Sequence, residues 1–225
     1  MRTQTKDIQM HLTPERAFEV LKEGNRRFIS NLRYNRNLLQ QVNETSDGQH
    51  PFAIVLSCID SRTSAELIFD QGLGDIFSAR VAGNVLNEDL LGSMEFACHL
   101  AGAKLIVVLG HSRCGAIKGA CSHVQLGHLT GLLNKISPAV YEVKKAGVVP
   151  EGSDEFSEAV AVENTRQQMR AILDRSPILE HLFDKGEIGI VGGMYSVETG
   201  EVQFFDQQFH KATAASEEAA TAAVG

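Results

Sequence analysis

The sequence predicts an α/β fold with a mainly parallel central sheet of four strands, to which a fifth strand is added, flanked by helices. Short apolar runs suited to buried strands occur at residues 52–57, 76–81, 104–110 and 188–195. Helical patterns separate these runs, and this alternation is typical of parallel sheets with right-handed crossovers. A Glu-Thr-Gly turn at residues 198–200 follows the last run and predicts a hairpin into a fifth strand at 201–205.

The helices are predicted from their ends and their apolar spacing. Thr13 and Pro14 suit the N-cap and first position of a helix that we expect to end near Ser30. Residues 31–50 are rich in Asn and Gln and weakly periodic, which indicates an irregular arm with some helix. The chain after Thr130 is expected to be mainly helical. Further helices are expected at residues 64–70, 88–101, 114–123, 154–173 and 177–186.

The chain of 225 residues is expected to form one main domain with an arm and a tail. Residues 1–50 are predicted to form an amino-terminal helical arm, and residues 51–210 the α/β domain. Residues 211–225 are rich in Ala, Glu and Thr, and we expect this tail to be disordered.

Composition argues against several function classes. With 43% hydrophobic and 22% charged residues, the chain resembles an ordinary soluble globular protein. A net charge of −7 argues against a nucleic-acid surface, and no apolar run approaches the roughly 20 residues that span a membrane. The first residues lead into no apolar segment like that of a signal peptide. We therefore expect a cytoplasmic protein whose four cysteines are thiols or metal ligands, with no nucleic-acid or membrane partner.

Three potential metal ligands follow two of the predicted strands. Cys58 comes directly after the run at 52–57, while His111 and Cys114 follow the run at 104–110. The carboxyl ends of neighbouring parallel strands meet at one edge of the sheet, so these side chains should converge. Two thiolates and one imidazole make a zinc site with one open position, as in catalytic zinc centres. The sequence therefore predicts one Zn²⁺ per chain in the domain at 51–210, with a structural zinc or plain core packing as the alternatives.

Asp60 and Arg62 lie beside the first ligand, and they leave two possibilities for the metal. The Asp60 carboxylate can occupy the fourth zinc position, or Arg62 can hold it away through a bidentate ion pair. Because two thiolates cancel the charge of Zn²⁺, the pKa of a zinc-bound water should fall less than at a tri-histidine site. We expect activity to rise toward alkaline pH.

The order of these motifs resembles the β-class carbonic anhydrases. The zinc signature C-x-D-S-R, followed by H-x-x-C, is present as residues 58–62 and 111–114, and similarity continues at 74–77, 80–84 and 189–195. The resemblance implies reversible hydration of carbon dioxide to bicarbonate and a proton, with zinc hydroxide attacking the carbon. By position, Cys58, His111 and Cys114 would bind zinc, while Asp60 and Arg62 would form the catalytic pair beside it.

The resemblance also implies residues that contact the substrate. Gln49 falls where one branch of the family places a glutamine that donates to the bound substrate, and Phe77 and Ala82 match positions that line an apolar carbon dioxide pocket. Phe96 stands where plant-type members often have a pocket tyrosine. Val55 stands where the branch whose zinc is closed by aspartate carries a tryptophan, which favours the open-site, plant-type-like branch.

The family resemblance implies a homodimer, often paired into a tetramer, with the pocket at the interface. The amino-terminal helices would clasp the partner subunit, and a single chain would leave the face carrying Phe18 and Phe28 uncovered. Two other functions fit the same ligands: hydrolysis of carbonyl sulfide or carbon disulfide, and a non-enzymatic zinc scaffold in which Asp60 is the fourth ligand.

Overall fold

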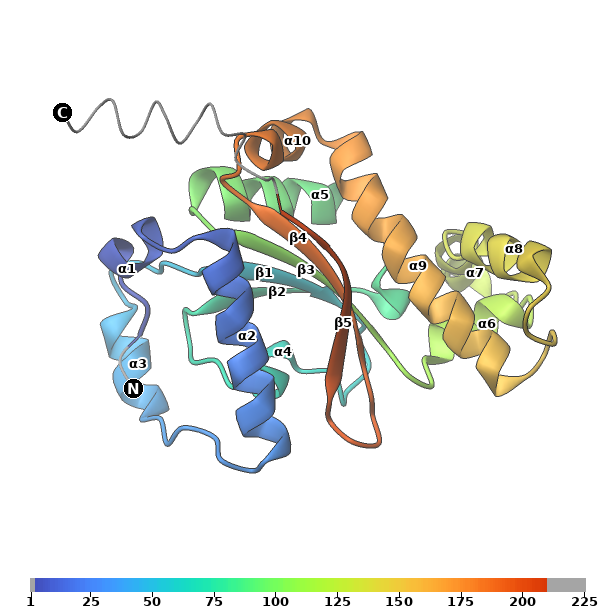
Figure 1. The fold of residues 1–225 in the computed structure, drawn as a ribbon, viewed down its shortest axis with the longest axis horizontal. Helices are drawn as coiled ribbons and strands as arrows, with labels where there is room; N and C mark the ends of the chain where they lie inside the picture. Colours follow the sequence, from blue (N-terminus) through green and yellow to red (C-terminus); the bar gives the residue numbers. More distant parts are fainter. Residues whose placement is uncertain (1–2, 210–225) are drawn as a thin grey trace.

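The computed structural model describes residues 3–209, which form a five-stranded sheet flanked by helices (Figure 1). The strand order is β2-β1-β3-β4-β5, with the first four strands parallel and β5 antiparallel to β4. The predicted fold class is confirmed. The strands are β1 (Ala53–Ser57), β2 (Ile76–Arg80), β3 (Leu105–His111), β4 (Gly189–Tyr195) and β5 (Val202–Gln208).

The helices agree with the predicted segments, except that one segment is subdivided and a short helix, α1, was not predicted. The segment predicted as one helix at 88–101 is an α-helix followed by a single π-helical turn, and the arm at 31–50 contains one short helix. The helices are α1 (Lys6–Met10), α2 (Pro14–Ile29), α3 (Leu38–Glu44), α4 (Ala65–Ile68), η1 (Ala82–Asn84), α5 (Glu88–Glu95), η2 (Phe96–Leu100), α6 (Gly115–Cys121), α7 (Gly127–Leu133), α8 (Ser137–Ala146), α9 (Asp154–Arg175) and α10 (Pro177–Asp184).

Helices cover both faces of the sheet, which explains why β1 and β3 are buried throughout and apolar up to their last residues. On one face, Ile54 and Leu56 of β1 pack with residues of α5, α9 and α10. On the other face, Ala53 and Val55 pack with residues of α2 and α4. A third cluster joins α6, α7 and α8 to the amino-terminal half of α9, beside the edge where β1 and β3 end (Figure 1).

The expectation that a single chain leaves the Phe18 face uncovered is wrong. Phe18 of α2 is only 3% exposed, and its ring meets that of Phe204 edge to face at a centroid distance of 4.8 Å. Phe28 is half-buried beside Gly200. The hairpin supplies the missing cover, because Phe204 of β5 and Phe209 directly after it both contact Phe18. The strand β5 itself extends to Gln208 instead of ending near 205.

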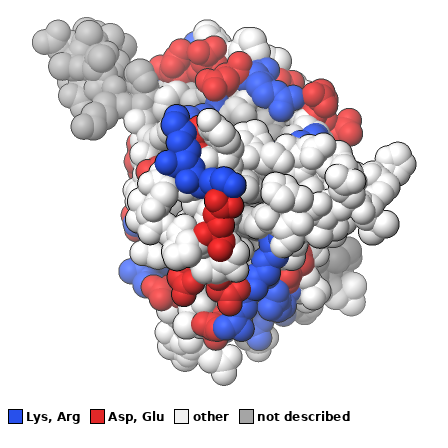
Figure 2. Space-filling view, turned by 90° about the vertical axis from the view of Figure 1, so that its right-hand side faces the viewer, with Lys and Arg blue, Asp and Glu red and all other residues white. Residues whose placement is uncertain are grey.

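Surface charge is mixed on the face shown in Figure 2, where Lys and Arg side chains lie next to Asp and Glu instead of forming one basic patch. Ion pairs such as Arg170–Glu163 and Arg175–Glu88 follow the same pattern. Within residues 3–209, no helix has the length and apolar character needed to cross a membrane. The predicted tail at 211–225 lies outside the described residues.

Candidate metal centre

The structure brings Cys58, His111 and Cys114 together at the carboxyl edge of the sheet. Their ligand atoms all lie within 4.8 Å of one another, and the three residues are 5%, 1% and 4% exposed. The strand register explains this meeting: β1 and β3 are adjacent, and Ser57 pairs with Leu109, so both strands end at the same edge. The convergence expected from the sequence therefore follows from two neighbouring parallel strands.

The turn that carries His111 and Cys114 is fixed to the neighbouring elements. Ser112 donates its N–H to the carbonyl of Tyr195 at 2.9 Å, and its hydroxyl accepts from the N–H of Val197 at 3.0 Å. Arg113 has a left-handed backbone, with φ of 55°, and its N–H donates to Oε1 of Glu158 at 2.7 Å. These bonds hold the loop between the two ligands against β4 and α9.

The chemistry of these three side chains fits a divalent metal ion. The Nδ1 atom of His111 lies 2.9 Å from the carbonyl of Ser112, whereas its buried Nε2 atom has no hydrogen-bond partner among the described residues. The Cys114 thiol, the His111 ring and backbone N–H groups favour the Cys58 thiolate and lower its pKa despite burial. That thiolate and burial in turn raise the pKa of Cys114. A bound cation would remove this conflict, because zinc takes both sulfurs as thiolates and a neutral imidazole nitrogen.

Asp60 is held by Arg62 and is not part of the three-atom cluster. The Arg62 side chain donates from Nε to Oδ1 at 2.9 Å and from Nη2 to Oδ2 at 2.8 Å, and its backbone N–H donates to Oδ1 at 2.9 Å. The hydrogen bonds from the Arg62 side chain hold the pKa of Asp60 well below its usual range, against a smaller opposing effect of burial. The carboxylate is therefore ionised at neutral pH and is an acceptor only.

The backbone between Cys58 and Asp60 is braced from β2. Arg80 donates from Nε to the carbonyl of Cys58 at 3.0 Å and from Nη2 to the carbonyl of Asp60 at 2.6 Å. The hydroxyl of Thr63 approaches the same two carbonyls at 3.0 and 2.9 Å. This bracing sets the first ligand and the Asp60–Arg62 pair at a fixed spacing.

Comparison with known proteins identifies the family to which this arrangement belongs. A sequence model of the carbonic anhydrase family matches residues 53–202. The chain belongs to the β-class carbonic anhydrase family. Carbonic anhydrase 2 of Mycobacterium tuberculosis is 34% identical over 201 residues, which cover 86% of this chain and 93% of that protein.

Solved structures of the family share the fold. The β-carbonic anhydrase CcaA is 28% identical with a TM-score of 0.67, over 85% of this chain and 94% of that one. A chain from the crystal structures of two tetrameric β-carbonic anhydrases of Sordaria macrospora also matches. The TM-score is 0.68 at 22% identity, over 72% of this chain and 84% of that chain. Membership confirms that the chain is a carbonic anhydrase enzyme, the class that hydrates carbon dioxide.

The substrate residues expected from the β-carbonic anhydrase pattern do not all lie at the metal centre. Ala82 begins η1, and the N–H of the next residue, Gly83, donates to Sγ of Cys58 at 3.3 Å. Gln49 is exposed, precedes β1 and lies beside Gly74, which precedes β2, whereas Cys58 follows β1, a strand roughly 13 Å long. Within one chain, Gln49 and the metal centre lie at opposite ends of β1.

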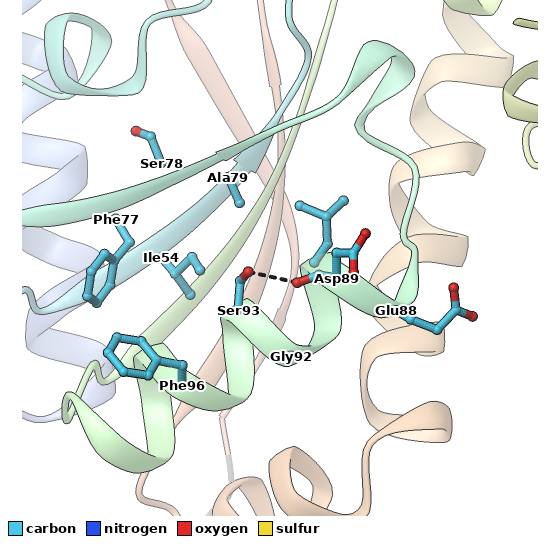
Figure 3. Close-up of a pocket in the computed structure, with 10 residues that line it drawn as sticks. Ile54, Phe77, Ser78, Ala79, Glu88, Asp89, Gly92, Ser93 and Phe96 are labelled. Carbon is cyan, nitrogen blue, oxygen red and sulfur yellow. Dashed lines mark hydrogen bonds between the residues drawn. The ribbon is translucent and has the colours of Figure 1, made fainter. Parts of the chain in front are cut away.

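Phe77 and Phe96 line a separate cavity of about 660 Å³ between β2 and α5 (Figure 3). Their rings meet at a centroid distance of 6.2 Å, and Ile54 lies beside them. The three potential metal ligands do not line this cavity. Phe77 is on the edge strand β2, and Phe96, which begins η2, is 52% exposed, so in one chain these residues lie at the molecular surface instead of in a wall of the metal centre.

Sequence reasoning missed several residues that support the centre. Thr63 and Glu158 belong to none of the recognised motifs, and Arg80 belongs only to the segment 80–84 that resembles the family. The buried amides Asn164 and Gln168 also contact the backbone beside the centre. Asn164 and Gln168 are detectable in the sequence, since they lie one helical turn apart among apolar residues that predict the buried face of a helix.

Proposed function

We propose that this chain catalyses the reversible hydration of carbon dioxide at one zinc ion held by Cys58, His111 and Cys114. The observation that carries this proposal is the cluster of three buried ligand atoms within 4.8 Å of one another. When bound, zinc would supply a water molecule of lowered pKa as the nucleophile for carbon dioxide. The buried, unpartnered Nε2 atom of His111 supports the same ligand set.

Asp60 would orient the nucleophile without taking its proton. A carboxylate has about four lone-pair sites, and the Arg62 bonds use two on Oδ1 and one on Oδ2. One acceptor site on Oδ2 is thus left for a further hydrogen bond. Because the pKa of Asp60 is held well below its usual range, the group accepts hydrogen bonds at neutral pH but does not serve as a base.

We also propose that the fourth metal position is open, as in the plant-type-like branch. The bidentate pair with Arg62 supports this, because both carboxylate oxygens are engaged by the guanidinium group. A scaffold in which Asp60 closes the zinc site would have to break both bonds. The geometry therefore favours an enzyme over a closed structural site.

A second copy of the chain would complete the substrate site. Gln49 lies at the opposite end of β1 from its own metal centre, so it would donate to a substrate only at the centre of a partner. Phe77 on the edge strand β2 and Phe96 at the start of η2 lie at the surface, where a partner would cover them. We propose a homodimer, with pairing into a tetramer as in the Sordaria macrospora proteins, which are described as tetrameric. A cytoplasmic location is proposed because a reducing compartment preserves the two ligand thiols.

The proposed function is tested by stopped-flow hydration of carbon dioxide together with metal analysis of the same purified protein. We expect turnover that depends on one zinc per chain, lost with a chelator and restored by added zinc. Full turnover after complete removal of zinc would contradict the proposal. The same preparation assayed on carbonyl sulfide tests the alternative substrate, for which we expect a much lower rate.

A further inference from the structure

The long helix α9 carries a buried polar pair on the face that it turns toward η1. Asn164 is fully buried, and Gln168 is 7% exposed. They lie four residues apart, so they share one face of the helix with apolar neighbours such as Val160 and Ala161. Burying an amide without hydrogen bonds is costly, so such a pair is favoured in an apolar setting only where its hydrogen bonds are satisfied.

Both amides bond to the backbone that follows β2. Nδ2 of Asn164 donates to the carbonyl of Gly83 at 2.9 Å, and the N–H of Leu86 donates to Oε1 of Gln168 at 2.8 Å. Nε2 of Gln168 also donates to Oδ1 of Asn164 at 3.2 Å. This bond orients the Asn164 amide so that its nitrogen, and not its oxygen, faces the carbonyl of Gly83. Helix α9 therefore holds the segment from Gly83 to Leu86 at two points.

Gly83 connects this network to the metal centre. Its N–H donates to Sγ of Cys58 at 3.3 Å, while its carbonyl accepts from Asn164. Its φ of 68° lies in the left-handed region, and a Cβ atom there would come within 2.8 Å of Cδ1 of Ile136. Glycine has no side chain to anchor it, so the direction of its N–H depends on how its backbone is held.

We infer that Asn164 is a positioning residue for the metal centre, which acts by fixing the Gly83 carbonyl and so aiming the Gly83 N–H at the sulfur of Cys58. Gln168 supports it by orienting its amide. Groups that orient a metal ligand typically contribute 10- to 100-fold, as an order of magnitude, to metal affinity or activity. The inference rests on the proposed zinc site, and its test separates the two.

The test compares Asn164→Leu with a matched control on the same helix. Leucine keeps the branching and the number of heavy atoms of asparagine but removes the donor to Gly83. The control is Thr165→Val: Thr165 is also fully buried, and its hydroxyl donates to the carbonyl of Ala161 within α9, at 3.0 Å. Zinc affinity is measured by competition with a chelator, and the thiolate-to-metal charge-transfer band is recorded after loading with Co²⁺. The thermal midpoint of the metal-free protein is measured alongside.

Asn164→Leu is expected to weaken zinc binding about 10- to 100-fold and to shift the cobalt band, whereas Thr165→Val changes neither. A folded Asn164→Leu protein with wild-type zinc affinity and an unchanged band overturns the inference, even if its thermal midpoint falls. Equal changes in Thr165→Val overturn it as well.

If Asn164→Leu does not fold, the variant Gln168→Met is used in its place. This substitution leaves Asn164 unchanged but removes the Gln168 amide that donates to Oδ1 of Asn164. A smaller weakening and a band shift in the same direction are expected, and no change in either overturns the inference. Failure of the wild-type protein to bind zinc or cobalt would instead overturn the proposed metal site, and the inference with it.

Discussion

Arg62 donates three hydrogen bonds to the Asp60 carboxylate, two from its guanidinium group and one from its backbone N–H. Only one residue separates the two, so the pair forms within a single turn and depends on no distant contact. It lies directly beyond the first potential metal ligand, Cys58. At the proposed zinc site, this pair would control two properties at once: where the carboxylate points, and whether it is free to reach the metal.

Replacing Arg62 with alanine should release the carboxylate of Asp60. We expect the freed Asp60 to bind zinc, with a Zn–O contact of about 2 Å in a crystal structure of the loaded variant, and turnover to fall with it. Arg62→Lys keeps the charge but not the bidentate geometry, so its turnover should lie between those of the wild type and Arg62→Ala. A variant Arg62→Ala with no such contact would show that the ion pair does not control access to the metal.

Asp60→Asn tests the orienting role. The substitution keeps the size of the side chain but removes the charge and turns one acceptor into a donor. We expect zinc content to be unchanged and turnover to fall about 100-fold or more, the usual effect of removing an oriented polar group at a reacting centre. Wild-type turnover in this variant would mean that the carboxylate does not orient the nucleophile.

Asp70 should make the stability of the fold sensitive to acid. It is buried after α4 and accepts from Arg27 at 2.5 Å and from Arg36. Burial alone would raise its pKa, but these hydrogen bonds outweigh burial and lower it. A carboxyl with a lowered folded pKa stabilises the protein above its unfolded pKa, about 3.9, and this contribution is lost as pH falls through the folded pKa.

Urea denaturation at several pH values between 7 and 3 measures this effect. Asp70→Asn should lower the free energy of unfolding by about 3 kcal/mol at pH 7, because it breaks a buried ion pair. It should also lose less additional stability than the wild type on acidification below about pH 4. The control Asp154→Asn removes an exposed carboxylate paired with Lys118 and should be indistinguishable from wild type. Equal acid sensitivity in all three proteins would contradict the assignment to Asp70.

The shared substrate site predicts complementation between two inactive variants. Gln49→Ala and Asp60→Asn should each have low activity as homodimers. A mixed dimer regains one intact site, built from the Asp60 of one chain and the Gln49 of the other, so random reassortment should restore about a quarter of wild-type activity. Activity equal to the average of the two variants would mean that Gln49 serves no partner site.

The fold was largely predictable because its strands are marked by strong local signals. The runs ending at Ser57 and Gly110 are apolar on both faces, as expected for strands covered on both sides. The cover of Phe18 was not predictable, since it depends on how far β5 extends and on which face Phe204 takes. Such contacts between distant segments leave no periodic trace in the sequence.

The candidate centre was predictable only where the chain itself brings groups together. The meeting of Cys58 with His111 follows from two adjacent strands, and the Asp60–Arg62 pair from two residues in one turn. The position of Gln49 at the opposite end of β1 became apparent only with the structure. The link from Asn164 to Cys58 passes through the backbone of Gly83, whose carbonyl and N–H carry no residue-specific signal.

Serine substitutions separate ligand thiols from ordinary buried ones. Cys58→Ser and Cys114→Ser should each lose zinc and turnover together, since an alcohol is a poor zinc ligand. Cys98→Ala serves as the control, because burial raises the pKa of the Cys98 thiol to about 12 and its sulfur lies outside the cluster. Zinc content and carbon dioxide hydration are measured on all three proteins. Loss of zinc in Cys98→Ala, or its retention in Cys58→Ser, would refute the ligand assignment.

Anomalous diffraction at the zinc absorption edge, from crystals of the active protein, tests the central claim most directly. We predict one peak per chain, about 2.3 Å from the sulfur atoms of Cys58 and Cys114 and about 2.0 Å from a nitrogen of His111. A peak bound by other residues, or no peak in crystals of fully active protein, would contradict it.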